Sequence, residues 1–261
     1  MNTRLSTPVT TRREMRLARA IARAGYTSRR KAEELIRQGL VRVNGRVVTD
    51  VTTRVDLERD RIEVAGHWID PNPPRVYVLL YKPRGVITSV SDPRGRKTVL
   101  DLIRPLGVRL FPVGRLDYHS EGLVLLTNDG DLAVRLMHPR YGCVKTYWVK
   151  VKGRPGRPAL QQLRAGVVID GRKRAPLRVA ILRYTARNTW LEVTLREGRK
   201  HQIRRMFQKI GHPVRKLIRV AIGPLTIGDL RPGQYRLLTR EEVVQLYRWT
   251  ESPGHAAEDR P

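Results

Sequence analysis

The sequence predicts an α+β protein in two parts: a small helix–helix–hairpin module and a larger domain with a mainly antiparallel, mixed sheet. Two amphipathic helical patterns and an Asn-Gly hairpin signal lie within the first 66 residues. Three prolines within residues 71–74 favour a stiff, extended connection. Beyond it, strand-like runs outnumber helical ones and few βαβ crossovers can be drawn, which favours an antiparallel α+β domain. We therefore expect the module over residues 15–69 and the larger domain over residues 75–250.

The module begins with a helix over residues 15–24, because apolar residues recur there at helical spacing and arginines share the opposite face. Gly25 ends this helix, and Ser28 can cap a second one. The alternating run 40–48 around Asn44-Gly45 then predicts a two-residue hairpin. The basic residues expected on the outer surface of these elements are Arg16, Arg19, Arg23, Arg29, Arg30, Lys31, Arg42 and Arg46.

The larger domain opens with a strand at Val76–Tyr81, followed by a turn at residues 82–85. Further strand-like runs fall at residues 110–113, 123–126, 147–151, 177–184 and 189–195. Helical stretches fall near residues 129–137, 159–165, 200–210 and 240–249. No repeat of solenoid period appears.

The charge of the chain predicts a polyanionic partner. There are 52 Lys and Arg residues against 24 Asp and Glu, which gives a formal net charge of +28. A preference for arginine over lysine can reflect genome composition or heat adaptation. Neither explains the surplus of positive over negative charge.

Several functional classes are disfavoured. The single cysteine, Cys143, excludes an internal disulfide framework and a cysteine-based zinc site, and a reducing, cytoplasmic location fits best. The six histidines lack metal-ligand spacing and no glycine-lysine phosphate loop appears, so neither a metal nor a cofactor is expected. The chain contains no apolar run of about 18 residues, so no membrane span is expected. No signal peptide is expected either. Residues 1–14 are expected to form a basic disordered arm, and residues 251–261 a disordered tail.

One carboxylate stands out by its position. Asp117 lies in a polar turn between two apolar runs, residues 110–113 and 123–126, so a packed sheet would hold it against a ligand. The same turn contains His119 and Ser120, the other ingredients of a hydrolase triad. Triad members come from separate elements, however, and there is no Gly-x-Ser-x-Gly motif, so a hydrolase is disfavoured.

Two segments carry a resemblance to a known family. Residues 114–133, which read GRLDYHSEGLVLLTNDGDLA, resemble the motif of pseudouridine synthases of the RsuA/RluB type, which isomerise single uridines in ribosomal RNA. Residues 15–66 resemble the small RNA-binding module called the S-four fold, through Ser28–Ile36 and the hairpin Val41–Asn44. The resemblance implies RNA docking through the module's basic surface and base isomerisation in the larger domain. A base must be flipped out of its stack for such chemistry.

The resemblance also implies the catalytic residues. Asp117 matches the essential nucleophile, and Tyr147 matches an active-site tyrosine whose ring could stack on the flipped uracil, although a tyrosine at a strand start is usually packing. Arg204 matches the partner of the nucleophile, where a guanidinium would keep the carboxylate ionised. A solvated helix face is the competing reading of Arg204. Whether the carboxylate attacks the sugar, attacks the base or removes a ribose proton stays open.

Three further residues are expected to bind substrate. Leu217 aligns with a leucine that packs on the nucleotide, although an ordinary strand residue is the competing interpretation. Arg115 matches an arginine that holds the distorted RNA, and Arg205 replaces Arg204 if the register is off by one. Relatives commonly show Asn and Thr where this chain has His119 and Ser120, so the roles of these two residues do not carry over.

The resemblance leans toward enzymes that modify the large-subunit 23S rRNA, because of the N-terminal module and residues 217–220 followed by Gly223. The alternatives are a 16S rRNA pseudouridine synthase and a non-catalytic RNA-binding factor of ribosome assembly. A monomer that acts on rRNA or on an assembly intermediate is expected.

Overall fold

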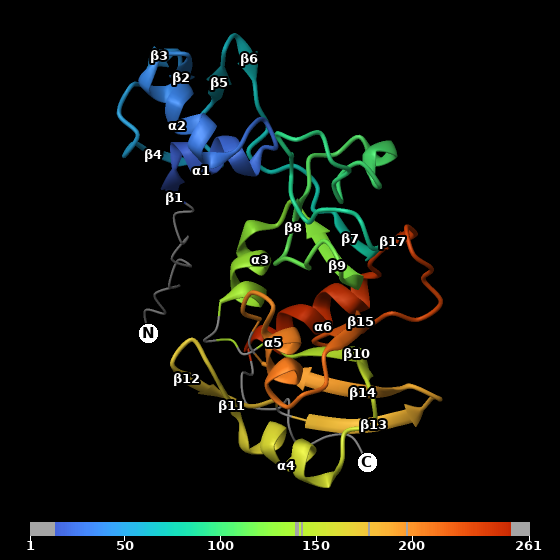
Figure 1. The fold of residues 1–261 in the computed structure, drawn as a ribbon. Coiled ribbons are helices and arrows are strands. Elements are labelled where there is room, and N and C mark those ends of the chain that lie inside the picture. Colours follow the sequence, from blue (N-terminus) through green and yellow to red (C-terminus); the bar gives the residue numbers. More distant parts are fainter. Residues whose placement is uncertain (1–13, 139–140, 142, 177, 197, 252–261) are drawn as a thin grey trace, which may run out of the picture. The chain divides into compact units, whose positions relative to one another are not determined.

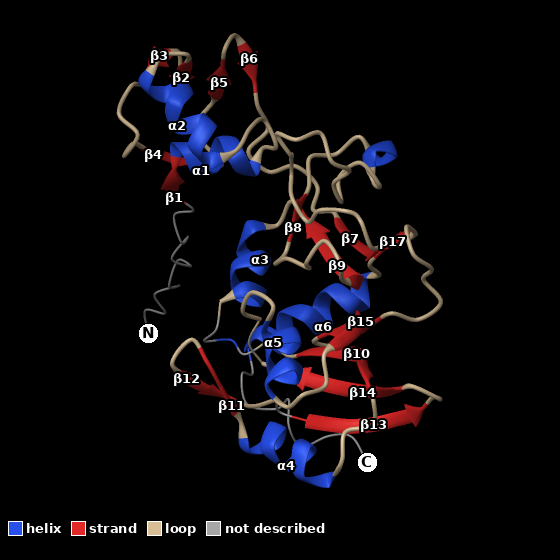
Figure 2. Cartoon of the chain, viewed as in Figure 1, coloured by secondary structure: helices blue, strands red, loops and turns tan. Residues whose placement is uncertain are grey.

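A computed structural model describes residues 14–138, 141, 143–176, 178–196 and 198–251 (Figures 1 and 2). The arm expected at 1–14 and the tail expected at 251–261 therefore lie outside the described residues, except for Glu14 and Glu251. The chain divides into two compact units between Arg75 and Val76, directly after the proline-rich segment. None of the described helices is long and apolar enough to cross a membrane.

The smaller unit contains the predicted helix pair and hairpin. Its elements are β1 (Glu14–Arg16), α1 (Leu17–Arg23), α2 (Arg29–Arg37), β2 (Val41–Val43), β3 (Arg46–Val47), β4 (Arg54–Asp56), β5 (Ile62–Val64) and β6 (His67–Trp68). Ser28 caps α2, since its side chain accepts a hydrogen bond from Lys31 N at 3.2 Å. Asn44 and Gly45 both have positive φ, as a tight hairpin turn requires. Four of the strands form a sheet in the order β3-β2-β5-β6. This sheet packs on the two helices around a core that includes Leu17, Ile21 and Ile36.

The larger unit is built on a nine-stranded sheet, which confirms the α+β prediction. Its strands are β7 (Tyr77–Lys82), β8 (Phe111–Pro112), β9 (Glu121–Thr127), β10 (Lys145–Lys152), β13 (Arg178–Tyr184), β14 (Asn188–Leu195), β15 (Val214–Ile222), β16 (Leu225–Thr226) and β17 (Tyr235–Leu237). The order is β13-β14-β10-β15-β9-β7-β17, with β16 on β15 and β8 on β9. All pairs are antiparallel except β9 with β15.

Helices cover both faces of this sheet. They are α3 (Gly130–Met137), α4 (Arg157–Ala165), α5 (Gln202–Lys209) and α6 (Arg240–Glu251). The unit also contains a short 3-10 helix, η1 (Arg104–Leu106), and a separate hairpin of β11 (Val167–Ile169) and β12 (Arg172–Arg174). Even-numbered residues of β7 and β9, such as Leu80 and Val124, pack with α4, α5 and the segment 86–116. Odd-numbered residues, such as Leu79 and Leu125, pack with α3 and α6. Because successive side chains of a strand point to opposite faces of the sheet, α5 and α6 lie on opposite faces.

Candidate active site

Asp117 lies in the turn between β8 and β9, where the sequence places it. The amide of Ser120 donates to Asp117 O at 3.0 Å and closes the turn. The segment 85–88 also binds this turn. Gly85 N donates to Tyr118 O at 2.9 Å, and the Thr88 hydroxyl donates to Leu116 O at 2.8 Å. The Asp117 side chain keeps 35% of its surface exposed. The backbone is thus fixed while the carboxylate remains open to a ligand.

Just after this turn, β9 and β15 approach unusually closely. Gly122 has φ +106°, and a Cβ added there would lie 2.2 Å from Arg219 O. Only glycine fits such an approach. Arg219, on β15, is 2% exposed, and its Nε donates to Leu123 O at 2.7 Å while its Nη1 donates to Arg115 O at 3.4 Å. One buried guanidinium therefore bonds the chain on both sides of Asp117.

Helix α5 and the residue that precedes it bring Arg204 and His201 to the turn. Ile203, Met206, Phe207 and Ile210 form a buried stripe, which turns the polar side chains outward. Arg204 Nη2 donates to His119 O at 3.2 Å and to Ser120 Oγ at 3.4 Å. His201 Nε2 lies 3.9 Å from Asp117 Oδ1. The site thus contains a histidine for which the sequence assigned no role.

The charges around Arg204 locate it near the carboxylate. Burial lowers the pKa of Arg204 most, attraction to Asp117 raises it, and repulsion from Arg84 lowers it further. Arg84 is exposed on the turn that follows β7. Arg204 therefore lies within electrostatic reach of both Asp117 and Arg84, which belong to two other segments of the chain.

The other expected site residues lie in different settings. Tyr147 and Leu217 are 7% and 5% exposed and share the core cluster of Leu116, the neighbour of Asp117. The Arg115 side chain is exposed. Arg205 points to the β11–β12 hairpin instead, with its Nη1 and Nη2 each 2.7 Å from an Asp170 carboxylate oxygen. Of the two adjacent arginines, Arg204 is the one whose hydrogen bonds reach the Asp117 turn.

A hollow lies beside His201. It is lined by Asp170, Arg199, Lys200, His201 and Arg205. Three permanent cations face one carboxylate there, so the hollow suits an anionic group such as a phosphate. Among the described residues, no three His, Cys, Asp or Glu side chains gather as a metal site.

Lys82 is a second buried cation that the sequence reasoning missed. It ends β7, is 0% exposed, and its Nζ donates to Pro83 O at 2.9 Å and Val86 O at 2.8 Å. Burial lowers its pKa to about 8, although Glu121 and Asp117 oppose that shift. Lys82 thereby holds the segment whose Gly85 amide supports the catalytic turn. Its signal in the sequence is a charge that directly follows the apolar run 76–81.

The basic residues predicted for the smaller unit are exposed, with one exception. The exposed ones are Arg16, Arg19, Arg29, Arg30, Lys31, Arg42 and Arg46. Arg23 is half-buried and donates to Pro71 O at 3.2 Å and Asn72 Oδ1 at 3.1 Å. It therefore ties α1 to the proline-rich segment.

Comparison with known proteins gives consistent matches over both units. A family model described as RNA pseudouridylate synthase matches residues 76–209, and one described as S4 domain matches residues 15–62. A Bacillus subtilis protein named ribosomal large subunit pseudouridine synthase B is 46% identical over 233 residues, which cover 88% of this chain and 95% of that protein. An Aquifex aeolicus protein named uncharacterized RNA pseudouridine synthase is 43% identical over 236 residues, which cover 90% of this chain and 94% of that protein. A solved crystal structure of a pseudouridylate synthase, 31% identical, superposes with a TM-score of 0.62 over 89% of this chain and 99% of its own. These matches confirm both resemblances that the motifs indicated.

Proposed function

Because the chain belongs to the RNA pseudouridylate synthase family, we propose that it isomerises one uridine of ribosomal RNA, and that this uridine lies in the large-subunit 23S rRNA. The placement of Asp117 carries the proposal: an accessible carboxylate on a rigid turn, flanked by Arg204 and His201. The relative named for the large ribosomal subunit supports the choice of RNA.

The reaction rearranges bonds without changing the atoms of the nucleotide. The glycosidic bond from N1 of uracil to C1′ of ribose breaks, the uracil turns, and C5 bonds to C1′. The proton on C5 leaves and N1 gains one, so no oxidant or metal is required. A carboxylate such as Asp117 can support both bond changes through covalent catalysis or proton abstraction. Arg204 would stabilise the negative charge of this carboxylate when it is the leaving group.

The remaining site residues take supporting roles. The Tyr147 ring would lie against the flipped uracil, and Leu217 would pack on the same nucleotide. Arg115, which is exposed next to the turn, would hold the displaced RNA. Arg205 is bound to Asp170, so we assign it to the wall of the hollow beside His201 rather than to the Asp117 carboxylate.

We propose that the smaller unit docks RNA through its exposed arginines and Lys31. Phosphate contacts release counterions, so the affinity should fall steeply with salt. A triple substitution of Arg29, Arg30 and Lys31 to Ala should reduce this salt slope, whereas an unchanged slope would contradict docking by α2. We also propose that the protein is a monomer and that it acts in the cytoplasm, where ribosomal RNA is made.

The test is pseudouridine mapping of rRNA from cells that lack the protein and from the same cells complemented with wild-type protein or with Asp117→Asn. We expect one 23S site to disappear, to return with the wild-type protein, and to stay absent with Asp117→Asn. Loss of a 16S site instead would favour the small-subunit alternative. If every site persists without the protein, the enzyme proposal fails and a non-catalytic assembly factor is favoured.

A further inference from the structure

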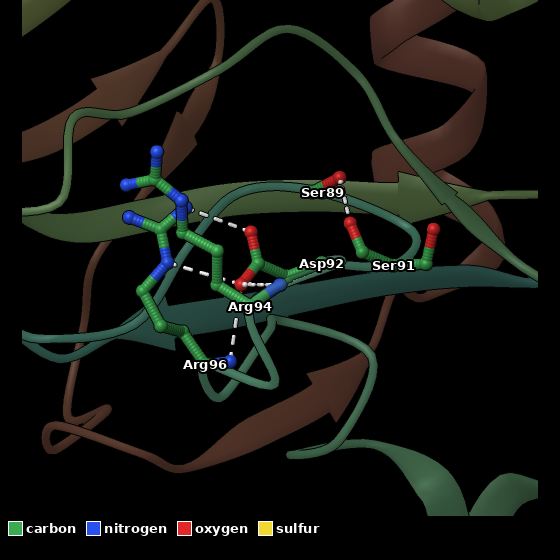
Figure 3. Close-up of polar contacts among 5 residues, drawn as sticks. All are labelled: Ser89, Ser91, Asp92, Arg94 and Arg96. Carbon is green, nitrogen blue, oxygen red and sulfur yellow. Dashed lines mark hydrogen bonds and ion pairs between the residues drawn. The ribbon is translucent and has the colours of Figure 1, made fainter.

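The connection from β7 to β8 contains a tightly built loop, Ser89–Lys97, organised by one carboxylate (Figure 3). The Asp92 side chain is 7% exposed. Its Oδ2 accepts from Arg94 N at 3.2 Å, Arg96 N at 3.1 Å and Arg96 Nε at 3.0 Å, and its Oδ1 accepts from Arg96 Nη2 at 2.7 Å. These bonds lower the pKa of Asp92 to about 2, chiefly through the Arg96 guanidinium. The loop is held in its conformation before any ligand arrives.

The loop displays positive charge to solvent. All residues from Pro93 to Lys97 are exposed, and three of the five are cations. The only carboxylate of the loop is Asp92, which is nearly covered. The Arg94 and Arg96 side chains extend to the same side of the loop in Figure 3. Two guanidinium groups directed the same way over one buried carboxylate favour an incoming anion.

Arg96 retains donors for such an anion. A guanidinium has five N–H groups, and Asp92 takes one from Nε and one from Nη2. The bonds to Asp92 also fix the plane of the Arg96 guanidinium, so less side-chain entropy is lost on binding. The remaining N–H groups can bind a phosphate.

The loop is tied to the segment that supports the catalytic turn. Ile87 N donates to Lys97 O and Val99 N donates to Ile87 O, both at 2.9 Å, which closes the base of the loop. Two residues earlier, Gly85 donates to Tyr118 O, next to Asp117. Tyr118 also raises the pKa of Arg96, after the larger effects of Asp92 and burial, which puts Arg96 within electrostatic reach of the turn. The loop therefore borders the site on the side of Tyr118.

We propose that Ser89–Lys97 is a clamp for the RNA backbone, in which Arg94 and Arg96 bind phosphates beside the flipped nucleotide. This inference rests on the proposed function, since it names the contact that the substrate RNA makes at the same site. Arginine binds phosphate bidentately, and a preformed loop loses less conformational entropy than a mobile one when RNA binds. Asp92 is a positioning residue in this clamp.

The test measures RNA affinity against salt concentration for Arg94→Ala, Arg96→Ala and the double variant. The probe is an unmodified transcript of 23S rRNA, and all proteins carry Asp117→Asn so that no turnover intervenes. Each lost phosphate contact should reduce the slope of log K against log salt by about 0.7–0.9, hence by about 1.5 in the double variant. The matched control is Arg248→Ala, an exposed arginine on α6, whose helix packs on the opposite face of the sheet. It should leave the slope unchanged.

The variant Asp92→Asn tests whether RNA binding depends on the fixed position of Arg96 or only on the net charge of the loop. It keeps the size of the side chain and makes the loop less negative, so a simple charge effect would strengthen binding. The clamp predicts weaker binding and a lower slope, with an unchanged midpoint of thermal unfolding. Slopes in the arginine variants equal to that of Arg248→Ala, or tighter binding by Asp92→Asn, would overturn the clamp. Failure of the proposed function is separate: the protein with Asp117 intact would then form no pseudouridine in the transcript, whatever the slopes.

Discussion

Replacing Lys82 by Met should change how the stability of the larger unit depends on pH. Burial lowers the pKa of Lys82 from 10.5 to about 8 in the folded chain. Between these values the unfolded chain binds a proton that the folded chain lacks, so the free energy of unfolding rises with pH. The difference between these two pKa values corresponds to about 3.4 kcal/mol in total, of which about 2 kcal/mol appears between pH 7 and 9.5. Methionine cannot titrate, so the wild type should gain this much relative to Lys82→Met over that range.

The assay is urea unfolding at constant ionic strength from pH 7 to 9.5, followed by tryptophan fluorescence. In a Trp68→Phe background, the remaining tryptophans, Trp148, Trp190 and Trp249, all belong to the larger unit. Lys152→Met is the matched control, because this lysine is exposed at the end of β10 and its ammonium stays in water on folding. The free energy of unfolding of the wild type minus that of Lys82→Met should rise with pH; a value that stays constant or falls as pH rises would refute a desolvated lysine beneath the catalytic turn.

Three further substitutions test the supports of the site. Gly122→Ala should lower the free energy of unfolding in urea by at least about 3 kcal/mol, because its Cβ would clash with the Arg219 backbone. The control Gly114→Ala also has positive φ but open space around it, and should lower the free energy of unfolding by about 1 kcal/mol. Equal losses in the two variants would contradict the close approach of β9 and β15. Arg219→Met removes the bonds on both sides of the turn and should lower kcat by about 10- to 100-fold with little change in KM; an unchanged kcat would show that the turn holds its geometry without them. Asp129→Ala removes the cap of α3 and the acceptor of two tyrosine hydroxyls, and should cost about 2–4 kcal/mol of unfolding free energy with kcat retained; a loss below 1 kcal/mol would contradict that network.

The features that the sequence predicts well are those set by neighbouring residues. The cap at Ser28, the Asn44-Gly45 turn and the apolar stripe of α1 each depend on side chains a few positions apart. The Asp117 turn belongs to this group as well, because two apolar runs on either side of a polar segment define a strand–turn–strand pattern locally.

The features that depend on distant pairing were not predicted. β15 was absent from the predicted strands because Arg215, Lys216 and Arg219 interrupt its apolar residues, yet it lies at the centre of the sheet and supplies the parallel pairing with β9. Charged residues are usually exposed, so the local sequence favours an exposed Arg219, although this residue is buried. Backbone carbonyls accept from both buried cations, those of Leu123 and Arg115 from Arg219 and the nearby ones of Pro83 and Val86 from Lys82.

The choice between the two adjacent arginines of α5 also required the fold. Helical spacing frees both Arg204 and Arg205 from the core, and only the position of Asp170 in the β11–β12 turn shows that Arg205 is bound elsewhere. His201 adopts a left-handed conformation with φ +55° directly before α5, which no sequence pattern indicates for a histidine. Its approach to Asp117 is a tertiary contact.

The role of Asp117 is tested most directly with the purified protein. Unmodified 23S rRNA transcript labelled with tritium at C5 of uridine releases tritium as pseudouridine forms. We expect wild-type protein to release one equivalent per transcript and Asp117→Asn to release it at least about 10³-fold more slowly, while its RNA affinity and unfolding midpoint stay at wild-type values. Release by Asp117→Asn at the wild-type rate would contradict the assignment of Asp117 as the catalytic carboxylate.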